Sequence, residues 1–162
     1  MTSICIETFG CSANFSDGEI MKGLLKEAQF EVVESKDDAE IIVLNLCTVK
    51  GDSAALREIR RTKEKFPNKK LVIAGCIPKS LLEAVQELAP EASLISTLNI
   101  KRITEAVEET IHDNPIRLLA RKRIEKINLP RIKNNPVVGI VQIGVEDADF
   151  PAIAHAVTTA GA

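Results

Sequence analysis

The sequence predicts an α/β protein with a doubly wound, mostly parallel five-stranded sheet packed between two layers of helices. Strand-like and helix-like segments alternate five times between residues 3 and 113. Two of the strand-like runs, "IIVLNL" at 41–46 and "KLVIAG" at 70–75, are almost purely apolar, which is typical of strands buried on both faces of a sheet. The composition, with 45% hydrophobic and 27% charged residues in a chain of 162, is that of an ordinary globular protein.

The first half of this pattern has clear local signals. Residues 3–9, "SICIETF", alternate in polarity and include β-branched residues, which predicts a strand. "SDGE" at 16–19 matches a capping box, so we expect a helix to begin there and to continue through "IMKGLLKEA". A short strand follows at 30–33, and the buried strand at 41–46 comes after the polar break "DDAE".

The second half continues the alternation. Asp52 or Ser53 is expected to cap the helix "AALREIRRTKEKF", which stops before Pro67. After the strand at 70–75, Pro78 lies near the first turn of the helix "PKSLLEAVQEL". The pattern closes with a strand at 92–97, "ASLIST", and a helix, "IKRITEAVEETIHD".

The domain organisation follows from where this alternation stops. Residues 1–115 are expected to form the globular domain. Residues 116–136 are rich in Lys and Arg and contain Pro130 and Pro136, so we expect an extended basic connector. Residues 137–162 begin with one more strand-like run, "VVGIVQIGV", and end in a tail that could form a short Ala-rich helix.

Three of the four cysteines follow predicted strands directly. Cys11 comes after the first strand, Cys47 after the third and Cys76 after the fourth. Because the carboxyl ends of parallel strands share one edge of the sheet, where ligands bind, we expect these three thiols to lie on one rim. They could instead be small buried residues that fill tight turns. Cys5 falls within the first strand and is expected to be a buried apolar residue.

The composition and the N-terminal sequence argue against a membrane or secreted protein. No apolar run reaches the roughly 18 residues of a membrane span, and "MTSICIETFG" lacks the features of a signal peptide. We therefore expect a cytoplasmic, reducing location, where spaced cysteines indicate metal binding or catalysis rather than disulfides. The absence of Tyr and Trp argues against a platform for stacking nucleobases.

The donor set favours an iron–sulfur cluster over zinc. A structural zinc site normally takes four protein ligands, and the chain has only two histidines to complete one. His112 ends a predicted helix and belongs at the opposite edge of the sheet, and His155 lies in the tail. A cubane held by three thiolates leaves one iron open to a substrate or another exogenous ligand.

Three separated stretches resemble the N-terminal domain of the radical-SAM methylthiotransferases, the MiaB-like family. They are "ETFGCSANFSDGEIM", "AEIIVLNLCTVKG" and "LVIAGCIPK", and the resemblance extends over residues 1–145. It is strongest to the archaeal and eukaryotic branch, which modifies threonylcarbamoyladenosine next to the tRNA anticodon. The resemblance implies that Cys11, Cys47 and Cys76 hold an auxiliary 4Fe–4S cluster whose open iron carries the sulfur that is inserted. It also implies tRNA as the partner of the full-length enzyme.

Polar residues near the cysteines are candidates to tune such a cluster. Asn14, Asn45 and Thr48 could donate hydrogen bonds to sulfur, which shifts the reduction potential. Asp17 and Glu19 cannot donate when ionised, and their position near a helix start explains them equally well. Two neighbours differ from the residues that the family often has, namely Leu46 in "NLCT" and Gly18 in "DGE".

The largest departure from the family comes after residue 145. No cysteine follows Cys76, so the C-x-x-x-C-x-x-C loop that binds the S-adenosylmethionine-cleaving cluster is missing. The resemblance implies that residues 116–136 link to a radical SAM domain, and that residues 137–162 are its truncated start followed by an atypical tail. We therefore expect the rest of that domain to be missing from this chain, and the chain alone to be inactive as a methylthiotransferase. No DNA or membrane partner is expected.

Two other functions remain open at this point. A flavodoxin-like module could bind a nucleotide or flavin at the same rim without iron, although "GCSANFSDG" is not a phosphate-binding glycine motif. A thiol redox protein could pair two rim cysteines, although no C-x-x-C supports it. The basic helix "LREIRRTKEKFPNKK" is either a solvent-exposed helix face or a surface that contacts tRNA phosphates.

Overall fold

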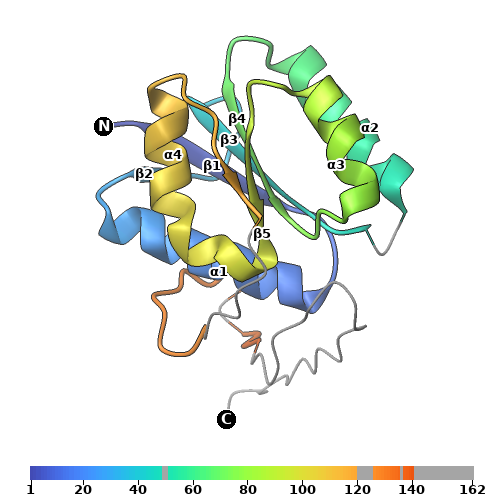
Figure 1. Ribbon diagram of the computed structural model, residues 1–162. Helices are drawn as coiled ribbons and strands as arrows, with labels where there is room; N and C mark the ends of the chain where they lie inside the picture. Colours follow the sequence, from blue (N-terminus) through green and yellow to red (C-terminus); the bar gives the residue numbers. More distant parts are fainter. Residues whose placement is uncertain (49–50, 120–125, 136, 141–162) are drawn as a thin grey trace.

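The computed structural model describes residues 1–48, 51–119, 126–135 and 137–140. They form a parallel six-stranded sheet in the order β2-β1-β3-β4-β5-β6 (Figure 1). The strands are β1 Ser3–Thr8, β2 Glu31–Val33, β3 Ile41–Leu46, β4 Lys70–Gly75, β5 Ser93–Ser96 and β6 Arg117–Leu118. The helices are α1 Ser12–Glu27, α2 Asp52–Lys65, α3 Lys79–Leu88, the 3-10 helix η2 Thr97–Arg102 and α4 Ile103–Ile111. The predicted doubly wound α/β class is confirmed.

Two helical layers enclose the sheet, with α1 and α4 on one face and α2 and α3 on the other (Figure 1). The strand β3 lies at the centre, and all six of its residues are buried. Val43 packs into the core beneath α1 and α4, whereas its neighbour Leu44 packs into the core beneath α2 and α3. Since each fully buried aliphatic side chain stabilises the fold by roughly 1.5–3 kcal/mol, the five aliphatic residues of β3 contribute to both layers of the core.

The sheet has one strand more than the five that were expected. Arg117–Leu118 forms β6 within the stretch assigned to the connector and pairs with β5. Next to it, the Leu94 N–H donates to the Ile116 carbonyl at 2.8 Å, and Leu118 is 7% exposed. A strand of two residues is too short to show a polarity pattern, which is why the sequence did not reveal it.

The first helix begins earlier than the capping box predicted. Cys11 is the N-cap of α1, and Ser16 and Glu19 lie inside the helix, both buried. Their side chains contact residues more than a hundred positions later in the chain instead of the helix's own first turn. The prediction of a capping box at 16–19 is therefore wrong, because tertiary contacts use the polar groups that it assigned to the helix end.

Several sequence predictions lie outside the described residues. These are residues 120–125 and 136 of the connector, the tail with His155, and the part of the strand-like run 137–145 that follows residue 140. Within the described part of the chain, no helix combines the length and the apolar character that a membrane crossing requires.

Candidate functional site

The three cysteine loops meet where the winding of the sheet reverses. From β1 the chain passes through α1 to β2, and from β3 it passes through α2 to β4 on the other side. The loops after β1 and β3 therefore diverge at the carboxyl edge, which is the usual ligand position of doubly wound sheets. Cys11 and Cys47 lie in these two loops, and Cys76 follows β4, the other neighbour of β3.

Two glycines let these loops approach one another closely. A Cβ on Gly10 would lie 2.3 Å from the Cys47 Cβ, so the loop of Cys11 is in contact with the side chain of Cys47. A Cβ on Gly75 would lie 2.2 Å from the Leu46 carbonyl oxygen, and Gly75 has a φ of +104°. The Cys76 N–H then donates to that same Leu46 oxygen at 3.0 Å. Both Gly-Cys pairs thus arise from close backbone approach around Cys47.

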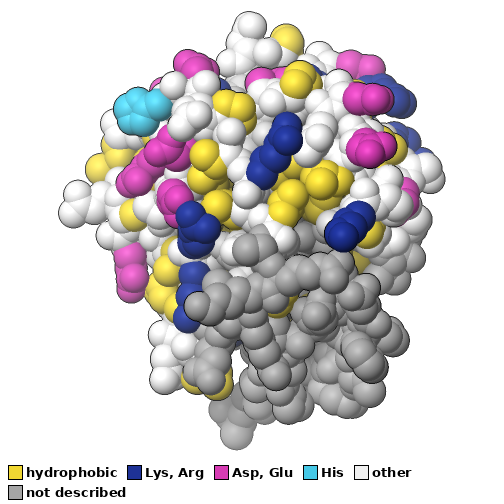
Figure 2. Space-filling view, viewed as in Figure 1, with side chains coloured by type: hydrophobic (Ala, Val, Ile, Leu, Met, Phe, Trp, Pro, Cys, Tyr) yellow, Lys and Arg dark blue, Asp and Glu magenta, His cyan; other side chains and the backbone are white. Residues whose placement is uncertain are grey.

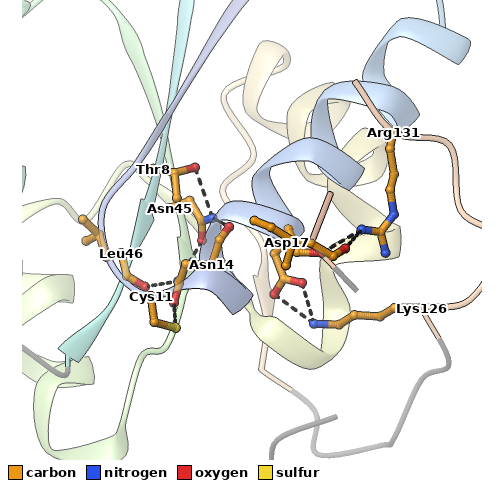
Figure 3. A network of polar contacts seen from close by, with 10 residues as sticks. Thr8, Cys11, Asn14, Asp17, Asn45, Leu46, Lys126 and Arg131 are labelled. Carbon is orange, nitrogen blue, oxygen red and sulfur yellow. Dashed lines mark hydrogen bonds and ion pairs between the residues drawn. The ribbon is translucent and has the colours of Figure 1, made fainter. Parts of the chain in front are cut away.

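Two buried asparagines lock the loops after β1 and β3 together (Figure 3). The Asn14 Nδ2 donates to the Leu46 carbonyl at 2.9 Å and to the Asn45 Oδ1 at 3.3 Å. In return, the Asn45 Nδ2 donates to the Asn14 carbonyl at 2.7 Å and to the Thr8 Oγ1 at 3.4 Å. The Cys11 Sγ donates to the Asn14 Oδ1 at 3.3 Å, so Asn14 contacts both a cysteine and the neighbouring strand.

The four cysteines fall into two environments. Cys11 and Cys76 are partly exposed and Cys47 is buried at the rim, whereas Cys5 is buried within β1 at 3% exposure. Burial, reinforced by the nearby Glu7, raises the pKa of the Cys5 thiol, which donates weakly to the Glu34 carbonyl at 3.5 Å. Cys5 is therefore a protonated core residue, as the sequence predicted.

The arrangement of the described residues differs from the usual ligand sets of single metal ions. Among the residues that the structure describes, no group of three His, Cys, Asp or Glu side chains is close enough to hold one ion. None of the four cysteines is in a disulfide. His112 caps the C-terminus of α4, beside the amino end of β4, and is remote from the rim.

The remaining predicted site residues have other contacts. Both carboxylate oxygens of Asp17 accept from the Lys126 Nζ at 2.8 Å, in a network separate from that of the asparagines (Figure 3). The Thr48 carbonyl accepts from the Gly51 N–H at 2.8 Å and closes the turn before α2. Sequence reasoning did not identify Lys126 as a partner, because nothing local links two residues 109 positions apart.

A cavity of about 340 Å³ lies beside the rim, between the end of β1 and α1. It is lined by Cys5, Ile6, Glu7, Thr8, Phe15, Lys22, Glu34, Lys36 and Asn134. Its charges are already paired, Lys36 with Glu7, and Lys22 with Glu34 at 3.1 Å. With two lysines and two carboxylates, the cavity has no excess positive charge that would attract the phosphate of a nucleotide or flavin.

These features define a doubly wound α/β domain with three cysteines at its topological switch point. The chain belongs to the family described as Uncharacterized protein family UPF0004, which matches residues 3–97 and so includes all three rim cysteines. The resemblance predicted from the three sequence motifs is thereby confirmed.

Relatives with a described function cover most of the chain. It is 37% identical over 149 residues to the threonylcarbamoyladenosine tRNA methylthiotransferase of Homo sapiens, a match of 86% of this chain and 25% of the relative. It is 35% identical over 152 residues to the Danio rerio protein of the same name, covering 88% of this chain and 27% of the relative. The probable threonylcarbamoyladenosine tRNA methylthiotransferase of Methanothermobacter thermautotrophicus is 32% identical over 142 residues, 86% of this chain and 33% of the relative. The chain thus spans about a quarter to a third of the length of these relatives.

Proposed function

We propose that this chain is the part of a threonylcarbamoyladenosine tRNA methylthiotransferase that binds an auxiliary 4Fe–4S cluster through Cys11, Cys47 and Cys76. The observation that carries the proposal is the joining of the three cysteine loops at one rim, through Asn14 and the Leu46 carbonyl. Family membership and the names of the relatives support it.

A cluster held by three protein thiolates has one iron with an open coordination position, which can take an exogenous sulfur ligand. The residues of this chain supply the three thiolates and hold their loops in place. Gly10 and Gly75 allow the loops to touch, and the buried Asn14 and Asn45 fix their relative position. We assign the S-adenosylmethionine-dependent step to other parts of the full enzyme.

The tRNA is the substrate of the whole enzyme in this proposal. On the face drawn in Figure 2, the described Lys and Arg side chains lie apart from one another, among acidic and apolar side chains. On α2, Arg57, Arg60 and Arg61 are exposed, whereas the Lys63 Nζ pairs with Glu91 at 2.6 Å. We interpret these basic residues as a solvated helix face, which is the usual role of a charge run on a surface helix, with contact to tRNA phosphates as the alternative.

Anaerobic reconstitution with iron and sulfide tests cluster binding. The wild-type chain should bind about four irons and about four sulfides and acquire the broad visible absorption of thiolate-ligated clusters. Cys11→Ala, Cys47→Ala and Cys76→Ala should each lose most of the iron and the absorption. Cys5→Ala is the matched control, since it removes a thiol that is buried within β1, and it should bind iron as the wild type does.

The outcome separates the remaining alternatives. Unchanged iron content in Cys47→Ala would exclude the rim as the ligand set. A chain that binds flavin stoichiometrically and no iron would instead support the flavodoxin-like module. A reversible disulfide between two rim cysteines, formed in a sample that never bound iron, would support the thiol redox function.

A further inference from the structure

Residues 126–134, here named the strap, lie against α1 although they are about a hundred residues later in the chain (Figure 1). The strap was expected to be an extended connector. It does lack helix and strand, but it contacts a row of buried polar residues on one side of α1. The charged and polar members of that row are Ser16, Asp17, Glu19 and Lys22.

A buried ion pair holds the first end of the strap. The Lys126 Nζ lies 2.8 Å from both carboxylate oxygens of Asp17, and the two side chains are 7% and 2% exposed. Two charges this deeply buried stabilise the fold only when they are together, because removing either one leaves an uncompensated charge away from water. The pair therefore ties the position of the strap to α1.

In the middle of the strap, backbone meets backbone. A Cβ on Gly23 would lie 2.4 Å from the carbonyl carbon and oxygen of Pro130 and 2.6 Å from the Arg131 nitrogen. Glycine destabilises a helix interior relative to alanine. The close approach of the strap explains why α1 has a glycine at this position.

The second end of the strap is held by hydrogen bonds of its main chain. The Ile132 N–H donates to the Glu19 carbonyl at 3.0 Å, and the Asn134 N–H donates to the Glu19 Oε1 at 3.0 Å. The Lys22 Nζ also donates to the Asn134 Oδ1 at 2.9 Å. These bonds give the strap a defined register along the helix.

One arginine links the strap to the residues that follow it. The Arg131 Nη1 donates to the Ser16 Oγ at 2.8 Å and to the Ile140 carbonyl at 3.2 Å (Figure 3). The same nitrogen therefore bridges α1 and a main-chain group beyond the strap. Ser16 lies five residues after the N-cap Cys11, roughly 7.5 Å along the helix axis, so this bridge is close to the cysteine end of α1.

We propose that the strap is an intramolecular docking segment that fixes residues 137–140 relative to α1, beside the helix end that carries Cys11. Ser16, Asp17 and Gly23 are its positioning residues on α1, and Lys126 and Arg131 are their partners. In a longer protein, this docking sets where the next domain leaves the cysteine rim. The proposal goes beyond cluster binding and holds for the chain without iron.

The iron-free full chain tests the proposal with two readouts. Val137 is 65% exposed and the chain has no Trp or Tyr, so Val137→Trp places a single reporter just beyond the strap. Its fluorescence anisotropy should match tumbling of the whole molecule and should fall towards that of a free segment when Gly23→Ala or Asp17→Asn is added. In these variants the Ile132 and Asn134 amides should exchange with solvent at least about tenfold faster.

Two controls distinguish release of the strap from other effects of the substitutions. Glu27→Gln removes an exposed carboxylate from the same helix and should change neither readout. Amides of the buried strand β3 should stay protected in every variant, which separates release of the strap from unfolding. Rapid exchange of Ile132 and Asn134 in the parent chain, or parental behaviour of both Gly23→Ala and Asp17→Asn, would overturn the proposal. Neither readout depends on iron, so a failure of cluster binding is a separate result.

Discussion

Single residues decide how closely the cysteine loops can approach one another. Gly10 and Gly75 each stand where a Cβ would collide with the segment around Cys47, and both have positive φ. At both positions, glycine is favoured because it adopts a positive φ without strain and because there is no room for a Cβ atom. The repeated Gly-Cys ending is therefore a packing requirement of the rim, whatever the rim binds.

Gly75→Ala should destabilise the fold more than a glycine replacement that meets no neighbour. Gly51 has a φ of +93°, and among the described residues only the Ser53 Oγ lies near its missing Cβ, at 4.0 Å, so Gly51→Ala mainly measures the cost of backbone strain. That strain amounts to about 1–3 kcal/mol. Gly75→Ala should cost about 1–3 kcal/mol more, because its Cβ would meet main-chain atoms that cannot easily move. Urea unfolding of both variants measures the difference, and equal losses would contradict the steric account.

At the scale of elements, α2 contains a buried hydroxyl group whose removal should stabilise the fold. Thr62 is 3% exposed, and its Oγ1 is buried without a hydrogen-bond partner among the described residues. Thr110 on α4 is equally buried, but its Oγ1 donates to the Ala106 carbonyl at 2.6 Å and lies 2.6 Å from the Ser93 Oγ. The two threonines therefore differ in hydrogen bonding and not in burial.

Thr62→Val should raise the free energy of unfolding by about 1 kcal/mol, because it removes an unsatisfied buried hydroxyl and keeps the shape of the side chain. Thr110→Val should instead lower it by about 1–2 kcal/mol, since it leaves the Ser93 hydroxyl without that partner. Chemical denaturation of the two variants gives the comparison. Destabilisation by both would mean that the Thr62 hydroxyl is satisfied in solution.

The elements also show which features local pattern can predict. The strands β3 and β4 and the helix α2 were predictable, because burial on two faces and helical periodicity leave strong local signals. The start of α1 was not, because Ser16 and Glu19 match a helix cap in sequence but serve the strap in the structure. A capping motif and a tertiary contact use the same residue types, so only the fold distinguishes them.

The rim was predictable for a different reason. Parallel strand order alone places the loops of Cys11, Cys47 and Cys76 at one edge, without any knowledge of side-chain contacts. The partnership of Asp17 with Lys126 depends on the path of the chain after β6, which no local pattern encodes. Burial of opposite charges far apart in sequence is a property of the tertiary structure and becomes visible only there.

At the scale of the whole molecule, the core continues past the boundary near residue 115 that the sequence suggested. Leu118 of β6 belongs to the core beneath α1 and α4, and Leu129 packs against it from the strap. β6 also covers the edge of β5, whose backbone groups would otherwise be unpaired. These contacts join β6 and the strap to the packed core of the domain.

Shortened chains locate the boundary by stability. A chain that ends at residue 114 loses β6, Leu118 and the strap, and should unfold at least about 2 kcal/mol more easily than one ending at residue 135, given the burial of a leucine. A chain that ends at residue 119 keeps β6 and should lie between them, because it still lacks the buried partner of Asp17. Urea midpoints of the three chains measure this order at constant protein concentration. Equal midpoints for the chains ending at 114 and 135 would place the domain boundary near residue 115. They would also mean that β6 and the strap do not stabilise the fold.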